Sequence, residues 1–102
     1  MQINIKELME KNRYHTINII DIRDPLSFQR GHIVNAMNIP VKNLLEEPQS
    51  FLKPKETYYL YCQTGRTSRQ LVNILNKRGY HTFDVIGGYK NYLSYKSDWT
   101  IM

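Results

Sequence analysis

Stretches rich in β-branched and aromatic residues alternate with stretches of helical periodicity, and this alternation restricts the possible folds more than any other feature. The pattern predicts strands over residues 16–22, 36–39, 57–62 and 82–86. It predicts helices over residues 5–11, 25–30, 41–47, 67–78 and 89–95. Strands that alternate with helices form a parallel or mostly parallel sheet covered on both faces. We therefore expect an α/β fold, in which the pattern leaves the strand order open.

Residues with capping preferences mark the ends of several helices. Asn4 precedes the first helix, and Asp24 is followed by Pro25, a pair typical of a helix start. Gly31 and Gly79 are well placed to end the second and fourth helices. Spacing predicts an apolar face on the fourth helix formed by Leu71, Val72, Ile74 and Leu75, and an inward face on the last formed by Tyr89, Tyr92 and Leu93.

The chain has 102 residues and a single cysteine, Cys62. This length predicts one domain spanning residues 1–102, large enough to build a core without cross-links. One cysteine permits neither an internal disulfide nor a cysteine-based zinc site, which favours a reducing compartment. The start of the chain is polar, and no apolar run approaches the ~20 residues of a membrane span. We expect a soluble, cytoplasmic protein without a membrane partner.

The formal net charge is +5, which raises the question of an anionic partner. The basic residues are scattered, however, and form no stripe interleaved with aromatic residues. We therefore do not expect the protein to bind nucleic acid.

Cys62 lies where a strand ends and a loop leads into a helix. Ligands bind at the carboxyl ends of strands in open α/β sheets. The free N–H groups and dipole of the helix, together with a loop curled at Gly65, would form a nest for an anion. We expect this nest to hold the Cys62 thiolate and to lower its pKa from ~8.5 toward or below neutrality. The competing interpretation is a buried core cysteine, and the strand-end position favours a functional one.

The loop alone leaves the chemistry open. The tyrosine-phosphatase pattern requires arginine six positions after the cysteine, where this chain has Ser68. A reductase that closes a disulfide requires a second cysteine, which is absent. A cysteine with histidine as general base remains open, with His15, His32 and His81 as candidates, although a thiolate of low pKa needs no base.

Three groups of residues, within 21–40, 61–68 and 75–88, together resemble the rhodanese-like family of single-domain thiosulfate sulfurtransferases. The first runs from Asp21-Ile22-Arg23-Asp24-Pro25 through Gly31-His32-Ile33 to Ile39-Pro40. The second is Tyr61-Cys62-Gln63-Thr64-Gly65-Arg66-Thr67-Ser68. The third is Leu75, Gly79-Tyr80 and Gly87-Gly88. Each piece alone is weak, whereas the ordered set is highly specific.

The resemblance implies a three-layer α/β/α fold with a central, mostly parallel sheet, and a Cys62 that cycles between thiolate and persulfide. It implies a thiosulfate or protein persulfide donor, a thiol or cyanide acceptor, and neither cofactor nor metal. The six-residue loop from Cys62 is the length that the family associates with sulfur substrates. The implied substrate-binding residues are Gln63, Thr64, Gly65, Arg66, Thr67 and Ser68, with Asp21, Arg23 and His32 in support.

Within this set, Arg66 is expected to steer an anionic donor and Asp21 to brace the cysteine loop. Many family members carry arginine at the position of Thr67. Two other functions therefore stay open: a sulfur carrier dedicated to one protein partner, and a non-enzymatic rhodanese-like binding module.

Overall fold

The structure, a computed structural model, describes the backbone of residues 1–101 and the side chains of residues 1–98. Five strands form one sheet in the order β1-β5-β4-β2-β3, and every neighbouring pair is parallel. The strands are β1 (Gln2–Ile3), β2 (Asn18–Asp21), β3 (Met37–Asn38), β4 (Thr57–Tyr61) and β5 (His81–Val85). The expected parallel α/β sheet is confirmed, with β4 at its centre.

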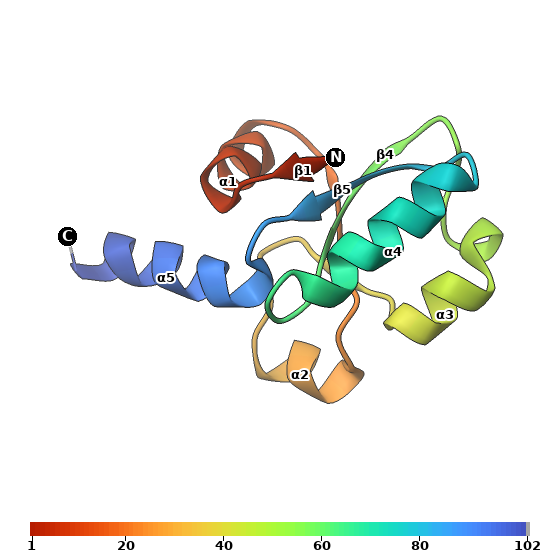
Figure 1. Ribbon diagram of the computed structural model, residues 1–102. Helices are drawn as coiled ribbons and strands as arrows, with labels where there is room; N and C mark the ends of the chain where they lie inside the picture. Colours follow the sequence, from red (N-terminus) through yellow and green to blue (C-terminus); the bar gives the residue numbers. More distant parts are fainter. Residues whose placement is uncertain (102) are drawn as a thin grey trace.

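Helices cover both faces of this sheet (Figure 1). They are α1 (Ile5–Tyr14), α2 (Pro25–Arg30), α3 (Val41–Glu46), α4 (Arg66–Lys77) and α5 (Gly88–Ile101), with a 3-10 turn at Pro48–Ser50. Helices α1 and α5 contribute to one buried apolar cluster, and α3 and α4 to another on the opposite face. The three-layer arrangement is therefore confirmed. No helix in the described part of the chain is long and apolar enough to cross a bilayer.

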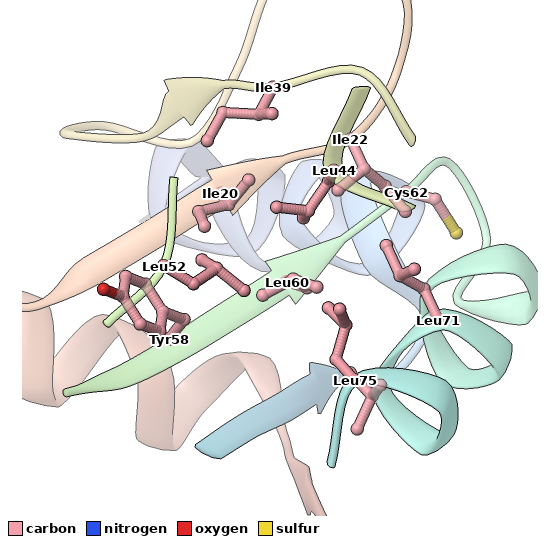
Figure 2. Close-up of a cluster of buried hydrophobic side chains, with 11 residues drawn as sticks. Ile20, Ile22, Ile39, Leu44, Leu52, Tyr58, Leu60, Cys62, Leu71 and Leu75 are labelled. Carbon is pink, nitrogen blue, oxygen red and sulfur yellow. The ribbon is translucent and has the colours of Figure 1, made fainter. Parts of the chain in front are cut away.

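The central strand supplies both clusters because successive strand side chains point to opposite faces. Tyr58 and Leu60 pack under α3 and α4, whereas Tyr59 and Tyr61 pack toward α1 and α5. Figure 2 shows the cluster under α3 and α4, with Leu60 inside it and the Cys62 sulfur at its edge, beside Leu71 of α4. The core therefore extends to the sulfur atom.

Local capping signals place the helix ends closely. The Asn4 side chain accepts a hydrogen bond from the backbone N–H of Glu7, and the Asp24 side chain accepts one from Ser27. Gly79 follows the last residues of α4 with a φ of 96°. The amides of Gly79 and Tyr80 donate back to the carbonyls of Asn76 and Leu75, which closes the helix.

Several features of the structure differ from the expectations. Strand β1 has no sequence signal, because two residues cannot show a period of two. Helices α1 and α5 run beyond the predicted ranges, to Tyr14 and to Ile101. Ile74 and Leu93 were expected to face inward but are 38% and 46% exposed. Ile74 precedes the buried Leu75 by one residue, and Leu93 follows the buried Tyr92 by one residue. A rotation of about 100° per residue carries each of them to the edge of the buried helix face.

Candidate active site at Cys62

Cys62 directly follows β4, at the carboxyl end of the sheet. The adjacent strand β2 ends alongside, where the amide of Ile22 donates to the carbonyl of Tyr61 at 3.0 Å. Only 8% of the Cys62 surface is exposed. The next residues form a tight loop that enters α4 at Gly65, the N-cap residue of that helix. The cysteine thus faces the amino end of a helix from the end of a central strand.

Backbone amides converge on the sulfur. The N–H groups of Gly65 and Ser68 donate to Cys62 Sγ at 3.2 and 3.4 Å. The Ser68 hydroxyl lies 3.4 Å from the same sulfur. Gly65 has a φ of 94°, and this left-handed backbone turns its amide toward the sulfur. The geometry matches an anion nest at a helix N-terminus.

These hydrogen bonds set the acidity of the thiol. Burial favours the neutral thiol and acts to raise the pKa of Cys62. The hydrogen bond between the thiol and the Ser68 side chain, together with those from the backbone of Ser68, Gly65 and Thr64, outweighs burial and lowers the pKa of Cys62 below its ordinary value. The lowered pKa is in the direction that the sequence predicts, and it favours a nucleophilic thiolate.

Asp21 and Arg23 form a buried ion pair beside the loop. The Asp21 carboxylate accepts from Arg23 Nη2 at 2.7 Å and from Arg23 Nε at 3.0 Å. Arg23 then donates from Nη1 to Gln63 Oε1 at 3.2 Å. Asp21 was expected to brace the loop directly. In the structure the Asp21 carboxylate is held by Arg23, whose guanidinium fits it in a two-pronged geometry, and Arg23 reaches the loop at Gln63.

The Arg23 guanidinium is fixed on every side. It lies 4.1 Å from the ring centroid of Tyr89 and 5.8 Å from that of Tyr61, and Nη2 donates to the carbonyl of Gly31 at 2.7 Å. Burial acts to lower the pKa of Arg23, but Asp21 and the two tyrosines raise it overall. Arg23 is therefore a charged structural link between α2, α5 and the cysteine loop.

The three histidines lie away from the sulfur. The ring of His32 stacks on Phe28 with centroids 3.7 Å apart, and its Nδ1 is 2.8 Å from the Phe28 carbonyl, so it holds the end of α2. His15 is the exposed C-cap of α1. His81 contacts Thr57 at the opposite end of β4. None of the three lines the pocket over Cys62.

An open pocket of about 390 Å³ lies over the sulfur. Its lining residues are Ile22, Arg23, Asp24, Ser27, Val41, Cys62, Gln63, Thr64 and Thr67. Among the expected binding residues, Gln63, Thr64 and Thr67 line this pocket, whereas Gly65 and Ser68 lie beneath the sulfur. Arg66 begins α4, is exposed and does not line it.

The pocket carries a negative charge at its rim. Hydrogen bonds from the backbone and hydroxyl of Ser27 lower the pKa of Asp24, so this exposed carboxyl is ionised at neutral pH. The positive charge of Arg23 is matched by Asp21 at 2.7 Å. A dianion entering the pocket therefore meets a carboxylate and no uncompensated cation among the lining residues.

Two structural partners of the loop were missed by sequence reasoning. Asp84, 2% exposed on β5, accepts a hydrogen bond from the Ser68 hydroxyl at 2.5 Å. Gly88 begins α5, and the next two amides, of Tyr89 and Lys90, donate to the carbonyls of Cys62 and Gln63 at 2.9 and 3.0 Å. Asp84 could have been noticed because it is a charged residue inside an otherwise apolar strand. The Gly87-Gly88 pair indicated only that the chain turns there, not that α5 contacts the loop.

No group of three or more histidine, cysteine, aspartate or glutamate side chains suited to a metal ion occurs within residues 1–98.

Comparison with known proteins gives a consistent result. The chain matches the model of the rhodanese-like domain over residues 3–95. It is 37% identical over 73 residues to the thiosulfate sulfurtransferase PspE of Escherichia coli, covering 71% of this chain and 70% of that protein. It is 32% identical over 80 residues to the uncharacterized protein YqhL of Bacillus subtilis, covering 78% of this chain and 63% of that protein.

A solved structure supports the same family as the domain match and the sequence relatives. The rhodanese-related protein of Thermoplasma volcanium superposes with a TM-score of 0.80 at 29% identity, covering 91% of this chain and 90% of that one. The family match spans the strand-end cysteine, its loop and the helices on both faces. The chain belongs to the rhodanese-like domain family.

Proposed function

We propose that the protein is a sulfurtransferase in which the Cys62 thiolate accepts a sulfane sulfur and passes it on as a persulfide. The observation that carries this proposal is the pair of amides, from Gly65 and Ser68, that donate to Cys62 Sγ at 3.2 and 3.4 Å. They favour the anionic sulfur needed for attack. Membership of a family with a relative named thiosulfate sulfurtransferase supports the same chemistry.

The proposed cycle has two displacements. The Cys62 thiolate attacks the outer sulfur of a donor such as thiosulfate, the S–S bond of the donor breaks, and sulfite leaves with the electron pair. The new persulfide carries its negative charge on the outer sulfur, close to the loop amides. An acceptor thiolate or cyanide then attacks that outer sulfur and restores the Cys62 thiolate. No external oxidant or reductant is consumed.

The experiment is mass spectrometry of the reduced protein after incubation with thiosulfate or with a persulfide donor. We expect a gain of one sulfur atom on the peptide that contains Cys62, and its loss with release of thiocyanate when cyanide is added. Protein alkylated at Cys62 beforehand is the control and should gain nothing. The absence of any gain with every donor, on a thiol shown to be free, would exclude sulfur transfer.

The pocket charge favours a second candidate for the donor, a persulfide carried by a partner protein. Thiosulfate is a dianion, and the Asp24 carboxylate at the pocket rim repels it. Ile22 and Val41 supply apolar surface in the same pocket. A persulfide on a polypeptide carries a single charge and offers side chains for that surface. This reaction would suit a dedicated sulfur carrier.

We expect Asp24→Asn to raise the kcat/KM for thiosulfate by about three- to fivefold at low ionic strength, because it removes one negative charge that faces a dianion. Asparagine caps a helix as well as aspartate does, so α2 should be retained. Steady-state kinetics at two salt concentrations would measure the effect.

Glu56→Gln is the matched control for Asp24→Asn. Glu56 is an exposed carboxylate whose ion-pair partner is Lys53, and it lies outside the pocket. Its loss should leave thiosulfate kinetics unchanged. An Asp24→Asn rate equal to the wild-type rate at low salt would mean that the rim charge does not act on the donor.

A further inference from the structure

We propose that Asp84 accepts the proton of the Cys62 thiol through the Ser68 hydroxyl, so that the nucleophile and its proton acceptor form one buried relay. The inference rests on the proposed sulfur-transfer function and adds a residue that the cysteine loop does not contain. Asp84 belongs to β5, sixteen positions beyond Ser68 in the sequence.

The three groups form a continuous line. Cys62 Sγ lies 3.4 Å from Ser68 Oγ, and Ser68 Oγ lies 2.5 Å from Asp84 Oδ1. Ser68 is fully buried and Asp84 is 2% exposed. A hydroxyl has a single proton, and here it points to the carboxylate. The free lone pair of Ser68 Oγ therefore faces the sulfur and accepts the thiol hydrogen.

Burial makes Asp84 a better base than an exposed carboxylate. It raises the pKa of Asp84, while the hydrogen bond from Ser68 and the positive charges of Arg69 and the amino group of Met1 act against this rise. These are the charged groups that act on the carboxyl from α4 and from the chain start. Cys62 faces it from the end of β4, through Ser68.

The transfer balances without any other reactant. The S–H bond of Cys62 breaks and its proton goes to Ser68 Oγ, while the Ser68 hydroxyl proton goes to Asp84 Oδ1. The result is a thiolate and a neutral carboxylic acid. Asp84 then donates to Ser68, whose own hydroxyl now donates to the sulfur. The thiolate gains a third hydrogen bond beside those from the two amides.

Groups linked in this way titrate as a pair. We expect a first step that yields a single negative charge shared by the two sites, and a second step, at higher pH, that yields thiolate and carboxylate together. Two readouts on the reduced protein follow the steps separately. Ultraviolet absorbance reports the thiolate, and the infrared C=O stretch reports a protonated buried carboxyl.

The wild-type protein should show thiolate together with a protonated carboxyl band over the same pH interval, and the band should vanish in the upper step. In Asp84→Asn, the band should be absent and the thiolate should form in one step, below the upper wild-type step. Cys62→Ser tests the relay even if the Asp84 variant does not fold. In Cys62→Ser the Asp84 carboxyl should ionise in one step. Glu56→Gln should titrate as the wild type does.

Thiolate formation without a protonated carboxyl band, or a carboxyl titration unaltered by Cys62→Ser, would overturn the relay. Both readouts need no sulfur donor, so they are independent of the test of the proposed function. Persulfide formation without coupled titration would reject the relay alone. Coupled titration without persulfide formation would reject sulfur transfer alone.

Discussion

Cys62→Ser is expected to reduce the release of thiocyanate from thiosulfate and cyanide by at least about 10³-fold, to the uncatalysed level. A serine oxygen cannot carry a sulfane sulfur, and the chain has no second cysteine to replace it. The smaller oxygen keeps its place near the amides of Gly65 and Ser68, so the loop should be retained. Thiocyanate assays on the purified variant would measure the loss.

The fold of the Cys62→Ser variant provides the control for that loss. Because a buried thiol is replaced by a hydroxyl of similar shape, we expect circular dichroism to be unchanged and the melting temperature to shift by no more than about 5 °C. A folded variant that retains a tenth of the wild-type activity would show that another group carries the sulfur.

Gly88→Ala is expected to destabilise the fold by about 3 kcal/mol or more and to suppress sulfur transfer. An added Cβ would lie 2.3 Å from the carbonyl oxygen of Cys62 and 3.0 Å from the carbonyl carbon of Gln63, both rigid backbone atoms. The positive φ of 58° adds strain. The clash would push α5 off the cysteine loop and break the bonds from Tyr89 and Lys90.

Gly79→Ala is the control that separates the steric clash of an added Cβ from the backbone strain of a positive φ. Gly79 also has a positive φ, of 96°, but an added Cβ would meet nothing within 4 Å. We expect this variant to lose about 1 kcal/mol and to keep its activity. Denaturant unfolding of both variants would measure the difference. Equal losses for Gly79→Ala and Gly88→Ala would mean that α5 is not seated on the loop.

Local signals made much of the fold predictable. Asn4, Asp24 and Gly79 act within one turn of their own helices, so the sequence nearby contains the information. The order β1-β5-β4-β2-β3 depends instead on which distant segments pair. Alternation along the chain says nothing about that choice. The two-residue β1 is defined by its bonds to β5 rather than by its own pattern.

The candidate site likewise has one part that local sequence predicts and another that depends on the pairing of distant segments. The position of Cys62 and the turn at Gly65 follow from a strand, a glycine and a helix in succession. The partners Asp84 and Gly88 come from β5 and α5, which meet the loop only because β5 pairs with β4. For Asp21, the structure places the Arg23 guanidinium against its carboxylate, and Arg23 in turn reaches the loop at Gln63.

The seating of α5 on the loop also determines which way the peptide planes point. The carbonyls of Cys62 and Gln63 are anchored to the amides of Tyr89 and Lys90. Within a trans peptide plane the carbonyl and the N–H group point in opposite directions, so this anchoring turns the N–H groups of Gln63 and Thr64 away from α5. The position of α5 therefore fixes the orientation of the peptide groups in the cysteine loop. Insertions should be tolerated in the exposed turn at residues 53–56, while a single residue added between β5 and α5 would misalign the amides.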